Sequence, residues 1–560
     1  MTEKTKIGLD FGTTYSVLSR LKKGEDGRVQ AEACALREGG EGAEIQDSMV
    51  LKDREGKLHF GTSARRKAGK KGTTAYTGFK MMLAETDAEL LNQRHYDETY
   101  TPRRIISEYM NDLLTKYRIA SDSERNLIDK LVVGVPEIWF ESTRTIDCRT
   151  ALKEIIQSTG CVNEVEIVSE PAAACAYFVQ NYFENTGEHY EGRILIIDYG
   201  GGTLDIALCD VTRNGTSGDV KVIERAGAGW NTQGRAGRAG MAFMEEIVKT
   251  ALKEKGLEEA EFISDPKFSR CVQYIEQELM DRVDDIKRKF QRNMLADPET
   301  IMDVFDEVEF RYDDCEVTYG MIAKAYNQVI RDLLDEKLDK IIRYMDQKGI
   351  DYTGEGEEDN FKIALAGGFC NFYLTERQIR DKFRDIAEDK RFQNIITDRR
   401  ECEKAIAYGA ALIANDVVEF KSAAPYSLGF ASRLDQDEPW YAIKKGDDID
   451  YGNVKMFTGA DGRELLFRGN SIPLIVFNFE EDPAYAIARE PLPRYQEKLR
   501  LEKDKIYKFG YSLDQSMVIT LHKWVVPNHR HPDVVEDEVT VVLDDIYNMM
   551  GNLMVIGGEA

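Results

Sequence analysis

One pattern of residues occurs twice in this chain and constrains its fold more than any other feature. Near the start, the apolar run Ile7-Gly8-Leu9 leads to Asp10 and then to a turn of glycine and threonine. The same order returns at Leu195-Ile196-Ile197, followed by Asp198 and a Gly-Gly-Gly-Thr turn. Apolar residues typical of a second strand follow each turn. Two strand–turn–strand units of this kind predict a duplicated architecture with two similar lobes.

Strand and helix patterns alternate around the two turns. Short apolar runs predict strands over 131–136, 165–168 and 361–366, and helices are expected over 141–158 and 170–182. Apolar stripes at helical spacing over 272–290 and 322–345 predict two further amphipathic helices with faces in the core. This alternation predicts an α/β fold.

The pattern changes after the last clear helix, which is expected over 405–413. Beyond it, strand-like runs at 472–479, 506–511, 517–522 and 539–543 are separated by polar turns. The predicted organisation is a two-lobed domain over 1–415, a connector over 416–425 and a mainly β domain over 426–560.

Charge and cysteine usage exclude several classes of function. The 560 residues include 75 Lys+Arg and 100 Asp+Glu, a net charge of −25, which disfavours binding to nucleic acid or to an anionic membrane surface. No apolar run is long enough to span a bilayer, and no targeting segment is expected at the start. Nine dispersed cysteines favour reduced thiols and a cytoplasmic protein. A metal site at His522, His529 and His531 is not expected, because a closed site usually needs four well-placed ligands.

The glycine turns point to phosphate chemistry. Glycine lets the backbone approach a phosphate closely, and successive N–H groups form a concavity that accepts its oxygens. An aspartate at the end of the preceding strand can hold magnesium through water. One such turn is a weak signal, but two of them, with a third glycine pair at Gly367-Gly368 after a predicted strand, favour a nucleotide site. Neither the GxxxxGK[ST] phosphate loop nor the GxGxxG dinucleotide fingerprint is found.

A set of motifs, in order and approximate spacing, resembles the ATPase domain of the heat shock protein 70 family over residues 5–415. The motifs are Asp10-Phe11-Gly12-Thr13-Thr14-Tyr15-Ser16, Val135-Pro136, Ser169-Glu170-Pro171-Ala172-Ala173-Ala174, Asp198-Tyr199-Gly200-Gly201-Gly202-Thr203-Leu204-Asp205, Ala366-Gly367-Gly368 and Ala407-Tyr408-Gly409-Ala410-Ala411. The resemblance implies a two-lobed, actin-like (ribonuclease H-like) ATPase domain followed by a mainly β domain. It also implies binding of ATP or ADP with magnesium.

The resemblance implies a role for each matched residue. The nucleotide-binding residues would be Gly12, Thr13, Thr14 and Tyr15 in the first phosphate turn, Gly200, Gly201, Gly202 and Thr203 in the second, Asp205 beside it, and Gly367 and Gly368. Asp10 and Asp198 would hold the water shell of magnesium, and Glu170 would lie near the metal and the attacking water. Lys80 aligns with the catalytic lysine that stabilises charge on the γ-phosphoryl group. The alternative for Lys80 is an ordinary solvated lysine.

The adenosine side departs from the family pattern. Asp284, Lys287 and Arg288 fit a helix that would contact ribose and adenine, with aspartate where the family has glutamate. After Gly367-Gly368 the family shows a Ser-x-Arg pattern whose arginine stacks on adenine, whereas this chain has Phe369-Cys370-Asn371. Asn371 cannot reproduce that stacking, and Phe369 would replace it in part. Nucleotide affinity and base choice are therefore open.

The expected function is a slow, magnesium-dependent ATPase of chaperone type. Nucleotide state would control the binding of an unfolded or specific protein or peptide client by the C-terminal β domain, with a co-chaperone or nucleotide-exchange factor as a further partner. The sequence leaves no room for the helical lid of the family, so a lidless relative is expected. The alternatives are a nucleotide-sensing scaffold with little hydrolysis, an actin-like assembly protein and a small-molecule kinase.

Overall fold

The structure is a computed structural model, and its description covers most of the chain. The described residues are 5–23, 29–36, 43–85, 87–120, 127–141, 148–214, 217–229, 239–258, 266–281, 308–312, 315–352, 361–383, 403–424, 427–431, 440–449, 451–459, 462–468, 474–478, 484–486, 500–514, 519–528, 537–542 and 554–556. The chain forms two compact units. The first comprises Met1–Ile138, Ile155–Val220 and Glu224–Phe420, and the second comprises Trp139–Glu154, Lys221–Ile223 and Lys421–Ala560.

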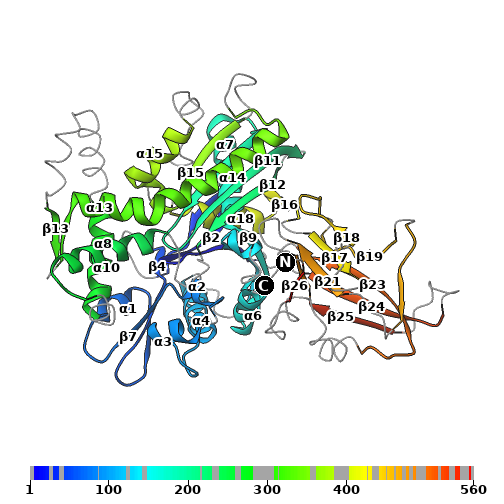
Figure 1. Ribbon diagram of the computed structural model, residues 1–560, viewed down its shortest axis with the longest axis horizontal. Coiled ribbons are helices and arrows are strands. Elements are labelled where there is room, and N and C mark those ends of the chain that lie inside the picture. Colours follow the sequence, from blue (N-terminus) through cyan, green and yellow to red (C-terminus); the bar gives the residue numbers. More distant parts are fainter. Residues whose placement is uncertain are drawn as a thin grey trace. The chain divides into compact units, whose positions relative to one another are not determined.

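The first half of the chain builds a mixed sheet in the order β3-β2-β1-β8-β9, with β4 paired to β2 (Figure 1). The strands are β1 (Lys6–Phe11), β2 (Tyr15–Lys23), β3 (Val29–Ala33), β4 (Ile45–Asp47), β8 (Ile128–Val135) and β9 (Val162–Ser169), and the helices are α4 (Pro102–Ala120), α5 (Ile138–Glu141), α6 (Cys148–Ser158) and α7 (Glu170–Thr186). β1 pairs with β2 in antiparallel orientation and with β8 in parallel orientation. Asp10 thus lies at the carboxyl end of a central strand.

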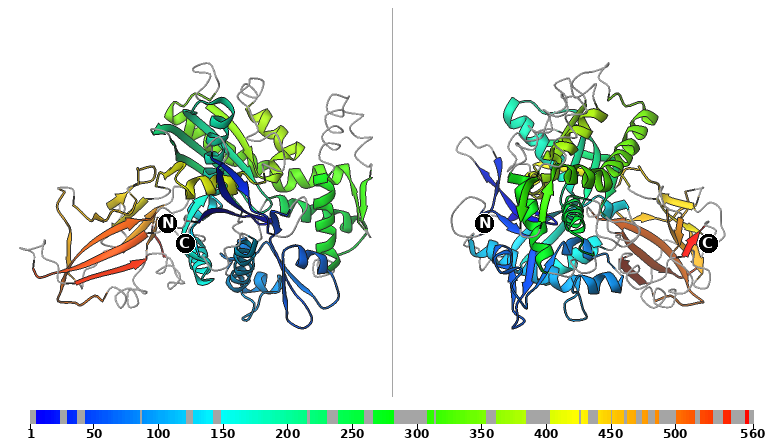
Figure 2. Two further views of the ribbon diagram at one scale, coloured as in Figure 1. Left: turned by 180° about the vertical axis from the view of Figure 1, so that it is seen from behind. Right: turned by 60° about the vertical axis from the view of Figure 1, so that its left-hand side comes forward.

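A small side sheet, in the order β6-β5-β7, is inserted between β4 and α4. Its elements are β5 (Met49–Lys52), β6 (Leu58–Phe60), α1 (Thr62–Lys67) and β7 (Thr74–Thr77), followed by α2 (Phe79–Met82) and α3 (Ala88–Gln93). The loop after α1 lies beside α10 (Pro266–Asp281), since a Cβ on Gly69 would be 2.4 Å from Cδ of Arg270 (Figures 1 and 2).

The second sheet repeats the arrangement of the first. Its strands β10 (Gly192–Tyr199), β11 (Leu204–Asn214), β12 (Ser217–Ala228), β15 (Phe361–Ala366) and β16 (Val418–Ser422) run in the order β15-β10-β11-β12-β16. β10 pairs with β11 in antiparallel orientation and with β15 in parallel orientation, as β1 does with β2 and β8. The predicted duplication is therefore confirmed at the level of strand order and direction.

Helices and short strands complete this part of the chain. They are α8 (Gly240–Glu254), α10, β13 (Val308–Tyr312), β14 (Cys315–Thr318), α13 (Tyr319–Tyr326), η1 (Asn327–Arg331), α14 (Asp332–Lys348), η2 (Gly368–Asn371), α15 (Tyr373–Lys382) and α18 (Ala405–Ala414). α7 packs against β10 and β11, and α14 packs against β11 (Figure 1). Strand β16 lies within the segment that the sequence predicts as a connector.

Small residues allow α18 to cross α7 at close range. α18 is buried along its whole length, and its sequence consists mainly of alanine with Gly409 at its centre. A Cβ on Gly409 would lie 1.7 Å from the carbonyl oxygen of Ala173 in α7, so only glycine fits at this crossing. The motif Ala407-Tyr408-Gly409-Ala410-Ala411 thus has a packing role.

The rest of the described chain is mainly β, as predicted. Two five-stranded sheets contain β17 (Ser427–Ala431), β18 (Trp440–Ile443), β21 (Leu474–Asn478), β22 (Ala484–Ala486) and β26 (Met554–Ile556) in one, and β19 (Lys455–Met456), β20 (Leu466–Arg468), β23 (Ile506–Leu513), β24 (Ile519–Val526) and β25 (Asp537–Val542) in the other. Tyr507, Phe509 and Tyr511 alternate along β23 and are buried. The described helices include none that is long and apolar enough to cross a membrane. The domain limits at 415 and 426 stay predictions.

Candidate functional site

The two glycine turns lie directly against each other. A Cβ on Gly202 would be 2.1 Å from Oγ1 of Thr13, and one on Gly201 would be 2.4 Å from Oγ1 of Thr14. Real Cβ atoms do not approach other atoms this closely, so the glycines are required by the contact between the turns. The structure therefore brings together the two halves of the repeated sequence pattern.

Each turn is fixed by hydrogen bonds to a neighbouring element. In the first, the hydroxyl of Ser48 donates to the carbonyl oxygen of Gly12 at 2.7 Å, and the N–H of Ser48 donates to the carbonyl of Thr14 at 2.8 Å. In the second, the N–H of Met241, in the first turn of α8, donates to the carbonyl of Gly201 at 2.7 Å. The turns are thus held in place before any ligand binds, which lowers the entropic cost of binding.

A cavity lies where the turns meet, and most of the predicted phosphate-side residues line it. The lining residues are Asp10, Gly12, Thr13, Thr14, Tyr15, Val17, Ile45, Lys80, Glu170, Asp198, Gly200, Gly201, Gly202, Thr203, Gly367, Gly368, Glu403 and Ile406. Four lining residues were not predicted as site residues from the sequence: Val17, Ile45, Glu403 and Ile406. Among these described residues, Lys80 is the one cation, and it faces four carboxylates.

Lys80 and Glu170 form a buried ion pair at the base of the cavity. Lys80 is 1 % exposed, and its ammonium group donates to Oε1 of Glu170. Glu170 begins α7, where the hydroxyl of Ser169 caps the helix by accepting from the N–H of Ala172 at 3.3 Å. Lys80 is therefore buried in the cavity, and the alternative of a solvated surface lysine is wrong.

Burial dominates the electrostatics of the aspartates. The pKa of Asp10 is raised to about 8, mainly by desolvation and also by the charge of Glu170, while the charge of Lys80 opposes the shift. Burial raises the pKa of Asp198 well above its ordinary range, and the charges of Glu170 and Asp10 add to this. Oδ2 of Asp198 is buried and has no hydrogen-bond partner. Carboxylates in this state are suited to a bound cation, which would compensate for their desolvation.

Asp205 follows the second turn, and its buried carboxylate contacts the backbone of Glu137. Its Oδ1 accepts from the N–H of Glu137 at 2.6 Å, and Glu137 forms a buried ion pair with Arg225, with Oε2 and Nη1 2.7 Å apart. Burial raises the pKa of Asp205 well above its ordinary range. Sequence reasoning missed Glu137 and Arg225, because Glu137 lies in the turn after β8 and Arg225 in β12, and no local pattern pairs residues so far apart in the chain.

The residues predicted to contact the base do not all line this cavity. Gly367 and Gly368 line the cavity, but the ring of Phe369 packs at 5.1–5.3 Å from the rings of Tyr199, Phe243 and Phe372 and is 5 % exposed. Phe369 is thus part of an aromatic cluster in the core. The backbone of Asn371 ends η2. Asp284, Lys287 and Arg288 lie outside the described residues.

Comparison with known families identifies the chain. The family model described as Hsp70 protein matches residues 6–419. The chain belongs to the Hsp70 family. Its fold is therefore the two-lobed, actin-like ATPase domain of that family followed by a β-rich region, as the sequence predicts.

Individual Hsp70 relatives match the chain only in part. Chaperone protein DnaK of Thermotoga petrophila is 28% identical over 233 residues, which cover 40% of this chain and 34% of that protein. DnaK of Thermotoga neapolitana is 29% identical over the same shares. The mitochondrial heat shock 70 kDa protein of Solanum tuberosum is 24% identical over 241 residues, which cover 38% of this chain and 32% of that protein. The alignments thus span about a third of the relatives' length.

Proposed function

We propose that this Hsp70 family member hydrolyses ATP to ADP and phosphate in the cavity between the glycine turns. The observation that carries the proposal is the buried ion pair of Lys80 and Glu170 beside two opposed phosphate-type turns. Backbone N–H groups and the hydroxyls of Thr13 and Thr203 would hold the β- and γ-phosphates. The choice of ATP rests on membership of the Hsp70 family, because the base-side residues of this chain differ from the family pattern and do not themselves identify the base.

We also propose that hydrolysis requires magnesium. Four carboxylates and one lysine line the cavity, so a triphosphate would meet net negative charge there. A bound magnesium ion would neutralise both the phosphate oxygens and the aspartates. Asp10 and Asp198 fit this role. Burial disfavours their charged forms, and a nearby cation would compensate for that loss of solvation. No three His, Cys, Asp or Glu side chains converge as direct ligands in the described chain, so contacts through water are proposed.

Lys80 and Glu170 would have different roles in hydrolysis. The ammonium group of Lys80 would stabilise charge that develops on the γ-phosphoryl group and orient the water. The carboxylate of Glu170 would accept the proton of that water as its oxygen attacks phosphorus. The bond from phosphorus to the β–γ bridging oxygen breaks, and ADP leaves with that oxygen. Asp10 and Asp198 would stay deprotonated while the cation is bound.

The C-terminal β region would supply the binding function. We propose that it binds an unfolded or specific protein or peptide client, and that nucleotide state changes its affinity. Such coupling requires that the two nucleotide states differ in their contacts with the linker segment. A co-chaperone or exchange factor is a further proposed partner. Peptide binding by the full chain, compared with ATP and with ADP present, tests this part. Equal affinity in both states would contradict it.

Phosphate release by the purified chain tests the hydrolysis. We expect slow release that depends on magnesium and falls by about tenfold or more in Lys80→Met. Release that is unchanged in Lys80→Met would contradict the assigned role.

A nucleotide-sensing scaffold with little hydrolysis is the second candidate. The observation that favours it is the burial of Phe369 in the aromatic cluster together with asparagine at position 371. Tight binding of ADP and ATP without measurable phosphate release would support this candidate over the ATPase.

A further inference from the structure

The side sheet is strongly basic in a strongly acidic chain. Between residues 49 and 77 there are eight lysines and arginines against two acidic residues, whereas the whole chain has a net charge of −25. Arg54, Lys57, Arg66, Lys70 and Lys71 are exposed. Such a local reversal of sign favours an anionic partner, because it would steer one to this surface.

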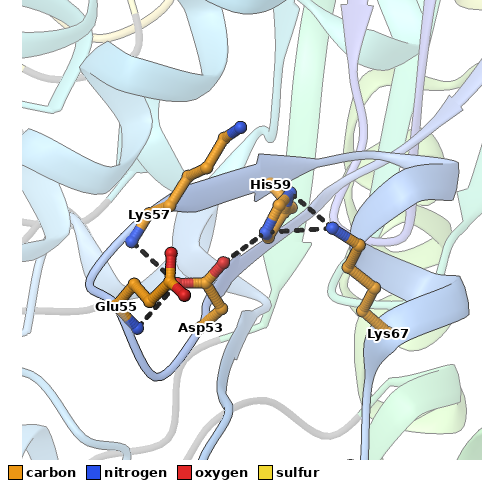
Figure 3. A network of polar contacts seen from close by, with 5 residues as sticks. All are labelled: Asp53, Glu55, Lys57, His59 and Lys67. Carbon is orange, nitrogen blue, oxygen red and sulfur yellow. Dashed lines mark hydrogen bonds and ion pairs between the residues drawn. The ribbon is translucent and has the colours of Figure 1, made fainter.

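One of the two acidic residues, Asp53, is engaged in hydrogen bonds within its own hairpin. Asp53 accepts from the N–H groups of Glu55 and Lys57 at 3.0 and 2.9 Å, and from Nε2 of His59 at 2.8 Å (Figure 3). The hydrogen bond from His59 is the main cause that lowers the pKa of Asp53. The carboxylate of Asp53 is thus engaged within its own hairpin, while the ammonium group of Lys57 extends away from it (Figure 3).

His59 also orients one of the cations. Nζ of Lys67 lies 3.2 Å from both ring nitrogens of His59, so the ring joins Asp53 on one side to Lys67 on the other (Figure 3). Lys67 is in α1, next to Arg66. For Arg66, the described residues provide no hydrogen bond or ion pair, so its charge is available to a partner.

A cavity of about 590 Å³ adjoins this surface and has two kinds of wall. Arg66, Lys67 and Lys116 line one part together with the hydroxyls of Thr62 and Ser63. Lys116 is paired with Asp112 at 2.6 Å, so Arg66 and Lys67 carry the available charge. Apolar side chains form the other part: Leu36, Ile45 and Phe60.

We propose that this cavity and the basic side sheet form a docking site for an acidic segment of a partner protein. The segment would place an apolar side chain against the apolar wall and its carboxylates against Arg66 and Lys67. The apolar wall favours a peptide over a nucleic acid, because phosphate backbones need no such wall. The site shares Ile45 with the nucleotide cavity but none of its charged residues, and the proposal does not depend on ATP hydrolysis.

Fluorescence anisotropy with the full chain tests the proposal. The probe is a labelled peptide of aspartate and glutamate with one central leucine. We expect about fivefold or more weaker binding in Arg66→Glu, which reverses the available charge, and in Ser63→Trp, which fills the cavity without changing charge. Both residues are exposed, so these variants should fold. Arg343→Glu makes the same charge change at an exposed position of α14 and should bind like the wild type.

Four results would overturn the proposal. They are the absence of binding by the wild type, equal loss in Arg343→Glu and Arg66→Glu, unchanged binding of a peptide with serine in place of leucine, and tighter binding of an oligonucleotide of equal charge. Phosphate release measured in the same variants should be unchanged, so failure of this site would be distinguishable from failure of the proposed ATPase.

Discussion

The ammonium group of Lys80 donates to the carboxylate of Glu170 in a pair that is almost fully buried. The pair joins the short helix α2 to the first residue of α7, and the ring of Phe11 lies 5.8 Å from the lysine nitrogen. Both groups are therefore held at the same point of the cavity, where charge can be stabilised without solvent reorganisation. The predictions below begin from this pair.

Removing the lysine charge should separate activity from stability. Lys80→Met leaves Glu170 buried without its partner, which typically costs about 3–5 kcal/mol of unfolding free energy. Lys80→Met/Glu170→Gln removes both charges and should recover most of that loss without recovering phosphate release. Urea unfolding and phosphate release measured on both variants check this. Recovery of turnover in the double variant would contradict the catalytic roles.

The contact between the turns should make Gly202 intolerant of a side chain. Gly202→Ala places a Cβ 2.1 Å from Oγ1 of Thr13, so the turns must separate, and we expect nucleotide affinity to fall by about tenfold or more. Gly200→Ala is a comparison within the same turn: its nearest protein contact would be 3.9 Å away, so the turns need not separate and any smaller loss reports crowding of the cavity alone. Calorimetric titration of both variants measures the difference. Equal affinities would show that the turns need not be in contact.

The raised pKa of Asp10 predicts a dependence of stability on pH. Its pKa is about 8 in the folded protein against an ordinary 3.8, so the folded state binds more protons between these values. Without metal, the unfolding free energy should therefore fall as the pH rises through this window, and Asp198 and Asp205 act in the same direction. Magnesium should restore stability most at the alkaline end. Urea unfolding at several pH values, with chelator or with magnesium, tests this.

Asp10→Asn provides the control for the pH experiment. Asparagine has no proton to lose, so the slope of stability against pH should become shallower. An unchanged slope would assign the effect to other groups.

Phe369 should behave as a packing residue. Phe369→Ala removes a ring that contacts three other aromatic rings and should cost about 3–5 kcal/mol of unfolding free energy. Phe369→Leu keeps most of the volume and should leave the ratio of ATP to GTP affinity unchanged. A marked change in that ratio would instead support stacking of Phe369 on the base in partial replacement of the arginine of the family.

Local sequence patterns predicted the parts of the fold that are continuous in the chain. The unit of strand, Asp and glycine turn is complete within about ten residues, so its two copies could be recognised and their strand pairing expected. The predicted strand at 361–366 matches β15, and the helix at 170–182 matches the core of α7. Of the helix predicted over 141–158, the part from Cys148 to Ser158 matches α6, and residues 142–147 lie outside the described residues.

Relationships across the fold could not be predicted in this way. The pair of Glu137 and Arg225 joins residues that are 88 positions apart, and nothing in either segment marks the other. The direction of the Phe369 ring depends on Phe243 and Phe372, which come from other elements. A catalytic role for Lys80 was suggested only by the family resemblance, because one lysine in a short helix has no periodicity.

The most direct test of the account is calorimetric titration of the purified chain with ATP, ADP and GTP in the presence of magnesium, with phosphate release followed in parallel. We predict binding of ATP and ADP that requires magnesium, together with slow phosphate release that falls about tenfold or more in Lys80→Met. Absence of nucleotide binding by the folded wild-type chain would contradict the account, because the cavity between the two glycine turns would then have no ligand of the proposed class.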